Sequence, residues 1–176
     1  MSAPSAWVAR FADLVPAGGT VLDVAAGGGR HTRLFLGRGH PVVAVDRTPT
    51  GMVDIAADPR LDLIEADIED GPWPLPGRRF AAIVVTNYLH RPLLPILADS
   101  LIDGGVLTYE TFALGNEAYG RPSNPAFLLR PNELIAAFAP HLTVLAYEHG
   151  VIQSPRLAVV QRIAAVAGKK LAVLCG

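Results

Sequence analysis

The sequence has a single cysteine, Cys175, in 176 residues. A lone cysteine forms no disulfide within the chain and has no cysteine partner with which to hold a metal ion. Cys175 also stands next to the C-terminal residue, where a catalytic nucleophile is not expected. We therefore expect no disulfide framework, no metal site and no thiol catalysis.

Long apolar runs are also missing, although the mean hydropathy is positive at +0.33. Arg, Asp or Glu interrupts every run before it reaches the roughly 18 uncharged residues that a membrane span requires. Residues 1–5 show no cationic stretch followed by an apolar core, the pattern of a secretory signal. These absences predict a cytoplasmic protein without a membrane segment.

Neither sign of charge dominates, because 15 basic residues oppose 16 acidic ones and the net charge is −1. A broad electropositive surface, typical of nucleic-acid binders, is not expected from this balance. The composition favours a small-molecule substrate over nucleic acid as the partner. We expect a monomer or a homodimer.

The length suits one domain, residues 1–176, with one substantial core and no separate substrate domain. Short apolar runs rich in Val and Ile alternate with helical segments, as in folds with buried parallel strands. We expect strands at 21–24, 41–45, 61–65, 80–86 and 105–109, and helices around Trp7 and Phe11 and at 31–38, 52–57 and 89–101. This alternation predicts a doubly wound, mostly parallel α/β sheet that is Rossmann-like.

The C-terminal third departs from that alternation. A helix is expected at 131–139, followed by strands at 142–149 and 157–166. Only residues 150–156 separate these two strands, which is too short for a crossover helix. We therefore expect an antiparallel hairpin at the sheet edge, which completes seven strands.

The first expected strand runs into a glycine turn at 27–29. Asp23, followed by small residues at alternating positions, Ala25, Gly27 and Gly29, resembles motif I of the class I S-adenosylmethionine-dependent methyltransferases. Small residues allow the backbone to approach a ligand closely. The resemblance implies that S-adenosyl-L-methionine is the cofactor and that these four residues, with Arg30, bind it.

Two details keep other functions open. Ala25 stands where the family usually has glycine, and an alanine backbone is confined mostly to negative φ. A dinucleotide turn needs a third glycine, which Thr32 replaces here, and Asp23 would repel a pyrophosphate but suit the ammonium group of a bound amino acid. Basic residues at the helix start can attract phosphate, so an NAD-dependent oxidoreductase is one alternative. A non-catalytic S-adenosylmethionine-binding protein is another.

Acidic residues also follow the second and third expected strands. Asp46 ends the second strand, where doubly wound folds place a carboxylate that accepts hydrogen bonds from ribose hydroxyls. The resemblance implies that Asp67 meets the adenine amino group and that Ile68 covers the edge of the ring. Since Asp23, Asp46 and Asp67 each end one of three successive strands, we expect them at one edge of the sheet.

In the same family, the segment after the fourth strand faces the transferable methyl group, and here it contains Asn87, Tyr88 and His90. It lacks the two prolines common in enzymes that methylate nucleobases, so an RNA methyltransferase is the weaker alternative. His90 has a suitable pKa for a general base, and Glu110 can accept a proton or orient a cationic acceptor. We expect Asn87 beside the cofactor, and Tyr88, His90 and Glu110 as the catalytic candidates.

Residues 112–130 form a long, Gly- and Pro-punctuated segment with little apolar periodicity. Loops of this length in a compact domain usually have a function. We expect this one to cover the acceptor site, and the segments around it resemble a branch of methyltransferases similar to the tellurite-resistance group. The prediction is a methyltransferase that acts on a small molecule by in-line methyl transfer.

Overall fold

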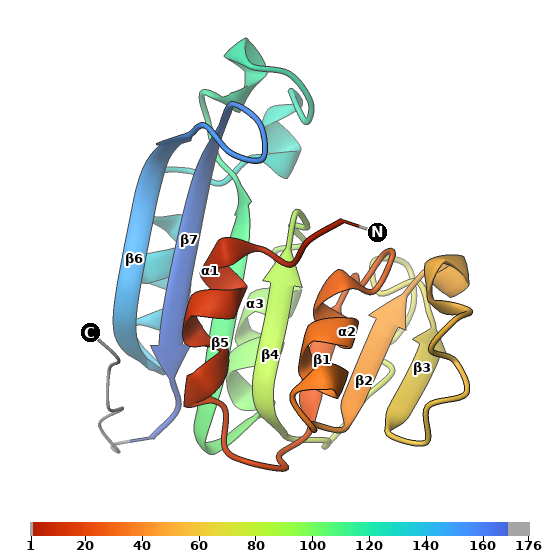
Figure 1. Ribbon diagram of the computed structural model, residues 1–176. Helices are drawn as coiled ribbons and strands as arrows, with labels where there is room; N and C mark the ends of the chain where they lie inside the picture. The colour runs from red at the N-terminus through yellow and green to blue at the C-terminus, as the bar shows by residue number, and fades with distance from the viewer. Residues whose placement is uncertain (1, 169–176) are drawn as a thin grey trace.

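The computed structural model describes residues 2–168, so Cys175 lies outside the described part of the chain (Figure 1). The strands are β1 (Val21–Val24), β2 (Val42–Asp46), β3 (Leu61–Glu65), β4 (Phe80–Thr86), β5 (Leu101–Phe112), β6 (Thr143–Ile152) and β7 (Ala158–Val166). The α-helices are α1 (Ala6–Phe11), α2 (Arg30–Gly37), α3 (Leu93–Asp99) and α4 (Glu133–Phe138). None of the helices within residues 2–168 has the length and hydropathy of a membrane span.

The seven strands form one sheet in the order β3-β2-β1-β4-β5-β7-β6. The first five strands along the chain are parallel, and β7 pairs antiparallel with both β5 and β6. The predicted mostly parallel sheet with an antiparallel C-terminal hairpin is therefore confirmed, with β6 at the edge. Strand order reverses between β1 and β4, and open α/β sheets bind ligands at the carboxyl ends of the strands beside such a point.

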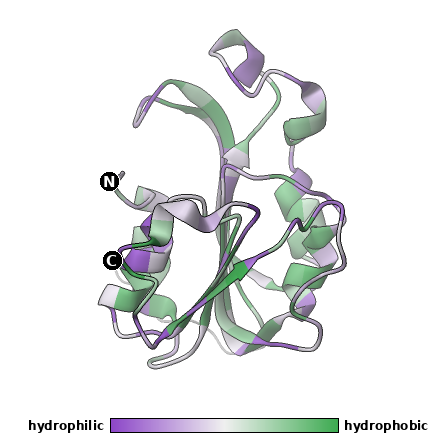
Figure 2. Ribbon diagram, turned by 90° about the vertical axis from the view of Figure 1, so that its right-hand side faces the viewer, coloured by the Kyte–Doolittle hydropathy of each residue, from purple (hydrophilic) through white to green (hydrophobic). Residues whose placement is uncertain are grey.

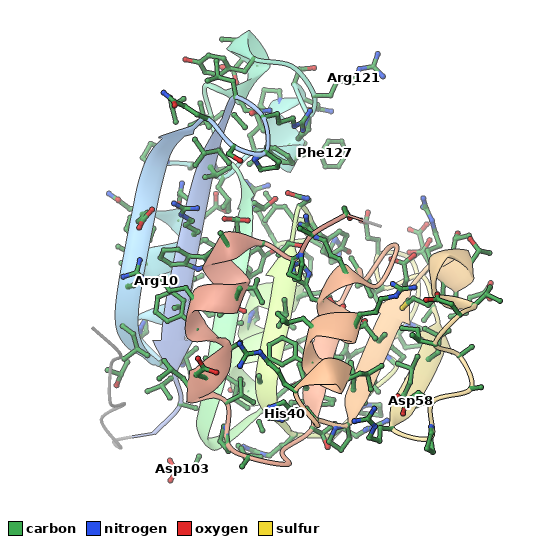
Figure 3. All side chains as sticks on the ribbon, in the orientation of Figure 1. Arg10, His40, Asp58, Asp103, Arg121 and Phe127 are labelled. Carbon is green, nitrogen blue, oxygen red and sulfur yellow. The ribbon has the colours of Figure 1, made fainter. Side chains whose placement is uncertain are left out.

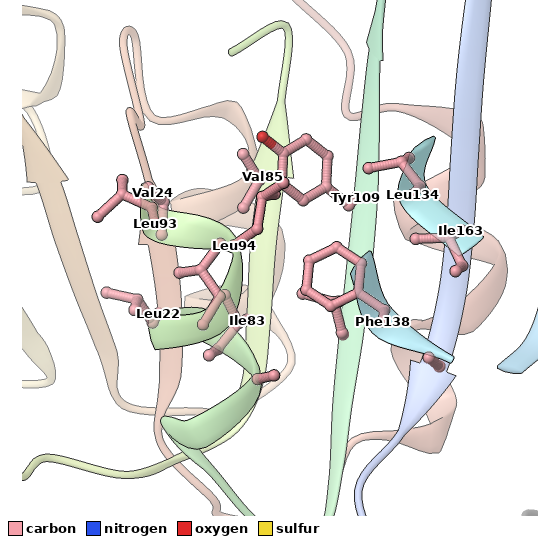
Figure 4. Close-up of a cluster of buried hydrophobic side chains, with 14 of the residues drawn as sticks. Leu22, Val24, Ile83, Val85, Leu93, Leu94, Tyr109, Leu134, Phe138 and Ile163 are labelled. Atoms are coloured by element: carbon pink, nitrogen blue, oxygen red, sulfur yellow. The ribbon is translucent and has the colours of Figure 1, made fainter. Parts of the chain in front are cut away.

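Helices cover both faces of the sheet and make three layers (Figures 1 and 2). Along β1, Leu22 and Val24 face a cluster built with α3 and α4, which Figure 4 shows, while Val21 faces α1 and α2. This alternation follows from the two-residue period of a strand. Because both faces are covered, the central strands are apolar along nearly their whole length. This continuous apolar character is why the sequence predicts them.

Two expected helices differ from the structure. A helix is expected at 52–57, but Met52 ends a short 3-10 helix, Pro49–Met52, and residues 53–57 form turns. Their bonds join residues three apart, as from the N–H of Ile55 to the carbonyl of Met52, because the buried Met52 side chain pins the segment against the glycine turn.

The helix expected at 89–101 is only α3, because Asn87 has a positive φ and Pro92 precedes the helix, so the residues between them cannot extend it. Leu101 already belongs to β5, which is longer than the strand expected at 105–109. The helix expected at 131–139 is shortened to α4, and the first helix forms where Trp7 and Phe11 predicted it.

The ends of β6 and β7 and the segment of residues 113–130 project above the other strands (Figure 1). This 113–130 segment contains two short 3-10 helices, Asn116–Ala118 and Pro125–Phe127, and Figure 3 labels Arg121 and Phe127 on it. Arg91 fastens its base, donating to the carbonyls of Ala126 (2.7 Å) and Leu128 (2.9 Å) and pairing with Glu133.

Candidate functional site

The turn between β1 and α2 is built on left-handed backbone. Gly27 and Gly29 have φ values of +54° and +71°, and Ala25 has +52°. The expected negative φ at Ala25 is therefore wrong, and the alanine adopts a conformation that costs an L-residue about 1–2 kcal/mol. Strained backbone of this kind persists where the surrounding structure enforces it, often at a functional site.

The glycines of this turn meet different demands. A Cβ on Gly29 would lie 2.4 Å from Cγ of Met52, and a Cβ on Gly51 would lie 2.8 Å from Cα of Gly28, so these positions are close-packed. A Cβ on Gly27 would meet nothing within 4 Å. Gly51 thus allows the backbone after β2 to approach the glycine turn, Gly29 makes room for the Met52 side chain, and Gly27 borders open space.

Asp46, at the end of β2, holds the glycine turn in place. Its Oδ2 accepts a hydrogen bond from the N–H of Gly27 at 2.7 Å, and its Oδ1 accepts one from the N–H of Thr48 at 2.8 Å. Each oxygen keeps a further lone pair for a ligand. The carboxylate therefore both shapes the turn and presents hydrogen-bond acceptors at the carboxyl end of β2.

Asp23 lies beneath the turn, where its residue is only 2% exposed. Its Oδ2 accepts hydrogen bonds from the N–H (2.9 Å) and the hydroxyl (2.7 Å) of Thr32 in α2. Burial raises the pKa of Asp23 to about 6, although the two bonds from Thr32 oppose that rise. This aspartate ties β1 to α2 and does not line a cavity.

The first cavity, called the Asp46 cavity, has a volume of about 420 Å³ at the carboxyl ends of β1, β2 and β3. It is lined by Ala25, Asp46, Arg47, Thr48, Ala66, Asp67, Ile68, Glu69 and Tyr88. Three carboxylates oppose one guanidinium in this lining, so the cavity has a negative formal charge. Asp46, Asp67 and Ile68 are thus brought together as expected, and Gly27 and Gly29 stand outside the lining.

Asp67 closes the turn that follows β3. Its Oδ1 accepts a hydrogen bond from the N–H of Glu69 at 3.0 Å, and its Oδ2 lies 3.9 Å from the guanidinium of Arg47. The bond from Glu69, and to a smaller extent the charge of Arg47, lowers the pKa of Asp67. The residue is therefore an ionised acceptor at the mouth of the Asp46 cavity.

Tyr88 lines the same cavity with a buried hydroxyl that has no hydrogen-bond partner within residues 2–168. Burial, and then the charge and close approach of the Glu69 carboxylate, raise the pKa of Tyr88, so the hydroxyl stays protonated and can donate to Glu69 or to a ligand. A buried hydroxyl without a partner costs free energy unless a ligand satisfies it. Tyr88 was expected among the catalytic residues, but the structure places it beside Asp46 and Asp67.

A second cavity, called the Glu110 cavity, has a volume of about 360 Å³. It lies between the N-terminal residues 2–6, the carboxyl ends of β4 and β5, and the β6–β7 turn. Asn87 lines it, while the next residue, Tyr88, lines the Asp46 cavity, so one loop after β4 separates the two spaces. Arg30, expected near the cofactor, also lines the Glu110 cavity.

Both carboxylate oxygens of Glu110 already have donors. Oε1 accepts from the hydroxyl of Ser5 at 2.8 Å, and Oε2 lies 3.2 Å from the guanidinium of Arg162 in β7. The N–H of Ser5 donates to Nε2 of His31 at 3.1 Å, which requires a neutral ring. Burial, and then the charge of Arg30, lowers the pKa of His31 to about 3.

Two parts of the expected acceptor side lie away from both cavities. His90 lines neither cavity, and only Phe112 of the segment 112–130 lines the Glu110 cavity. The 113–130 segment is held away by Arg91, and the β6–β7 turn and the N-terminal residues border the space instead. Apart from Phe112, this segment therefore does not cover the Glu110 cavity.

Sequence reasoning also missed Ser5, Thr32, Arg156 and Arg162. Ser5 carried one usable signal, since it precedes the apolar helix that contains Trp7, and its hydroxyl does accept the N–H of Trp7 as an N-cap at 3.2 Å. Arg156 and Arg162 stand in or beside an edge hairpin, and nothing local indicates the cavity that they border.

No protein-family model matches the sequence, and no curated protein matches it. Solved structures do match. TehB from Haemophilus influenzae superimposes with a TM-score of 0.75 at 16% identity, over 96% of this chain and 64% of TehB. The chain has the methyltransferase fold.

Two further structures with this fold were solved with a cofactor product bound. The glycopeptide N-methyltransferase MtfA, complexed with S-adenosyl-L-homocysteine, matches with a TM-score of 0.64 at 19% identity, over 95% of this chain and 91% of MtfA. The 1,6-didemethyltoxoflavin-N1-methyltransferase of Burkholderia thailandensis matches with a TM-score of 0.65 at 21% identity, over 92% and 76%. The resemblance seen in the glycine turn is therefore confirmed for the fold, and the present chain spans less than two thirds of TehB.

Proposed function

We propose that this protein is an S-adenosylmethionine-dependent methyltransferase that acts on a small molecule. The observation that carries the proposal is the Asp46 cavity, which joins two strand-end carboxylates, an apolar wall at Ile68 and the unpartnered hydroxyl of Tyr88. The neighbouring Glu110 cavity supplies a separate space for the acceptor.

The lining fits S-adenosylmethionine better than a dinucleotide. S-adenosylmethionine carries a sulfonium, an ammonium and a carboxylate group and is a net cation, whereas NAD carries a pyrophosphate and a pyridinium and is a net anion. Three carboxylates and one guanidinium around the Asp46 cavity attract the former and repel the latter. This charge balance supports the methyltransferase over the NAD-dependent alternative.

Particular residues would hold the parts of the cofactor. Asp46 would accept hydrogen bonds from the ribose hydroxyls, and Asp67 with Ile68 would meet the adenine ring. Tyr88 would donate its hydroxyl hydrogen to a polar atom of the same ligand. We propose this role for Tyr88 in place of a catalytic one, and a positioning role for Asp23 through Thr32.

When bound, the cofactor would supply a methyl group carried on sulfonium sulfur, which a lone pair of the acceptor would accept. The protein has to hold donor and acceptor in line and exclude water. The loop at Asn87 and Tyr88 lies where the two cavities meet. Glu110 shapes the acceptor side through Ser5 and Arg162.

Nucleic acid does not suit the described surface as an acceptor. Near the projecting end, Arg91 is paired with Glu133 and Arg156 belongs to the lining of the Glu110 cavity, and the net charge of the whole chain is −1. A protein that binds RNA through phosphates needs unpaired cations over a broad surface. A small molecule therefore remains the better candidate.

Calorimetry with S-adenosylmethionine, S-adenosylhomocysteine and NAD tests the proposal. We expect both sulfur compounds to bind and NAD to bind at least tenfold more weakly. Release of S-adenosylhomocysteine with a metabolite mixture then separates an enzyme from a protein that only binds the cofactor. Binding of NAD without either sulfur compound would overturn the proposal, and so would methylation of RNA without any methylated metabolite.

The first prediction concerns Asp46. In Asp46→Ala, loss of charge-assisted hydrogen bonds of about 1.5–3 kcal/mol each, before compensation by water, should weaken S-adenosylhomocysteine binding at least tenfold. Asp58→Ala is the matched control, because Asp58 pairs with Arg60 and lines neither cavity. Unchanged affinity in a folded Asp46→Ala protein would leave this carboxylate with only its role in the glycine turn.

A further inference from the structure

The charges around the Glu110 cavity do not cancel. Its lining contains three guanidinium groups, those of Arg30, Arg156 and Arg162, but a single carboxylate, that of Glu110. This is the reverse of the Asp46 cavity, where carboxylates dominate. The two adjoining spaces thus select for ligand groups of opposite charge.

One part of this charge is neutralised within the protein. Arg162 pairs with Glu110 at 3.2 Å and also with Glu148, which in turn lies 3.7 Å from Arg10. Two arginines and two glutamates therefore form a balanced chain. Since Ser5 occupies the other oxygen of Glu110, this carboxylate does not offer an unpaired negative charge to a cationic acceptor.

Arg30, which donates to the hydroxyl of Thr86 at 3.3 Å, and Arg156 have no acidic partner within residues 2–168. Of the two, Arg156 lies beside the apolar part of the lining. Its guanidinium lies over the ring of Phe112, with its carbon 5.1 Å from the ring centroid, and donates one hydrogen bond to the carbonyl of Arg121 at 2.8 Å. A guanidinium has five N–H donors, so others stay available for an anion. The carbonyl and the ring orient the group without cancelling its charge.

The wall beside Arg156 is apolar. Phe112, Ala158 and Val160 belong to a small buried cluster that also contains Leu128, and Ile152 packs against it. All of these except Leu128 line the cavity. The cavity therefore combines an apolar wall with a cation at its edge, and this combination suits an amphipathic organic anion.

We infer that the Glu110 cavity binds a methyl acceptor that has an apolar body and a carboxylate, and that Arg156 holds the carboxylate. The inference rests on the proposed function, because it assigns the acceptor of the same site. It makes Arg156 a specificity-determining residue, and it makes the pair of Glu110 and Arg162 part of the cavity's framework.

The test uses protein loaded with S-adenosylhomocysteine and two pairs of probes, phenylacetate with phenylacetamide and octanoate with octanamide. Each pair has nearly one shape but differs in charge. We expect at least one acid to bind about tenfold more tightly than its amide, the effect of one charge-assisted contact. If neither acid binds, or if the amides bind equally well, the inference is overturned.

Arg156→Met removes the charge and keeps much of the apolar stem. This variant should lose the preference for acid over amide, and Arg156→Lys should retain part of it. Arg130→Met, at an exposed arginine that lines neither cavity, should retain all of it. The affinity for S-adenosylhomocysteine should not change in any variant. A preference that survives in Arg156→Met, or an equal loss of S-adenosylhomocysteine affinity, contradicts the assignment.

The two proposals fail in different ways. If S-adenosylhomocysteine does not bind the wild-type protein, the proposed function fails. If it binds but the acids do not, only the acceptor class is wrong. Tighter binding of selenite than of either acid would also overturn the inference, because an inorganic oxyanion has no apolar body to pack against the apolar wall.

Discussion

The Asp46 cavity and the Glu110 cavity adjoin, but they are assembled differently. Residues 25–88 supply the whole lining of the first, and they come from consecutive strand–turn units. The second draws on residues 2–6, 30, 87, 110–112 and 152–162. Its key hydrogen bond joins Ser5 and Glu110, which are 105 residues apart. A cavity built from consecutive units can be recognised in a sequence, whereas one built from distant segments cannot.

The largest expected effect is on the pH dependence of stability, and it concerns two buried groups, Asp23 in β1 and His31 in α2. The pKa of Asp23 is raised from 3.8 to about 6, so the folded state binds the extra proton and the free energy of unfolding falls as pH rises through this range. The pKa of His31 is lowered from 6.5 to about 3, so the unfolded state binds the extra proton and the free energy of unfolding rises with pH. The two effects oppose each other.

We expect Asp23→Asn and His31→Gln to reveal the opposing slopes. Between pH 4.5 and 6.5 each group alone changes the free energy of unfolding by about 2 kcal/mol. Stability should therefore rise with pH in Asp23→Asn, fall with pH in His31→Gln, and change less in the wild-type protein. Urea unfolding at the two pH values measures this. Equal slopes in the three proteins would rule out the shifted pKa values.

A smaller effect on stability tests whether the two cavities are independent. Ser5→Ala removes the N-cap of α1 and the donor to Glu110, which should destabilise the protein by about 1 kcal/mol. S-adenosylhomocysteine affinity should stay within twofold, because Ser5 does not line the Asp46 cavity. A thermal melt and a titration measure the two quantities.

Ser100→Ala is the control for that variant, since its hydroxyl donates to Ile96 at the end of α3, outside both cavities. Its stability should also fall while both cavities keep their ligand affinities. Tenfold weaker S-adenosylhomocysteine binding in Ser5→Ala would mean that the two cavities are not independent.

The smallest expected effect lies in the turn of the Asp46 cavity. Ala25→Gly relieves a left-handed alanine, and after the entropic cost of glycine the protein should gain about 0.5–1 kcal/mol. Ala26→Gly, beside it, has no positive φ to relieve and should lose about that much. Denaturant melts compare them, and a loss in Ala25→Gly would show that this alanine is not strained.

The assignments of three residues that line the Asp46 cavity share a local cause. Asp46 was assigned from its position at a strand end, and Asp67 and Ile68 from the family resemblance of the segment after the third strand. The covered sheet made these strands visible as apolar runs that stop at an acid. Asn87 has a positive φ, which turns the chain at this position. Because of this turn, the side chain of Tyr88, the next residue, lines the Asp46 cavity and not the Glu110 cavity. No periodicity in the sequence indicates such a turn.

The amino-acid sequence by itself determined the order of strands and helices, the closing hairpin and the glycine turn, because alternation, chain reversal and left-handed backbone depend on neighbouring residues. Only the tertiary structure decided the acceptor side. Glu110 has its partners at the N-cap of α1 and on β7, and Arg156 reaches its place through Phe112 and the carbonyl of Arg121. These contacts exist because helix packing and strand pairing bring distant segments together, and no local pattern encodes that meeting.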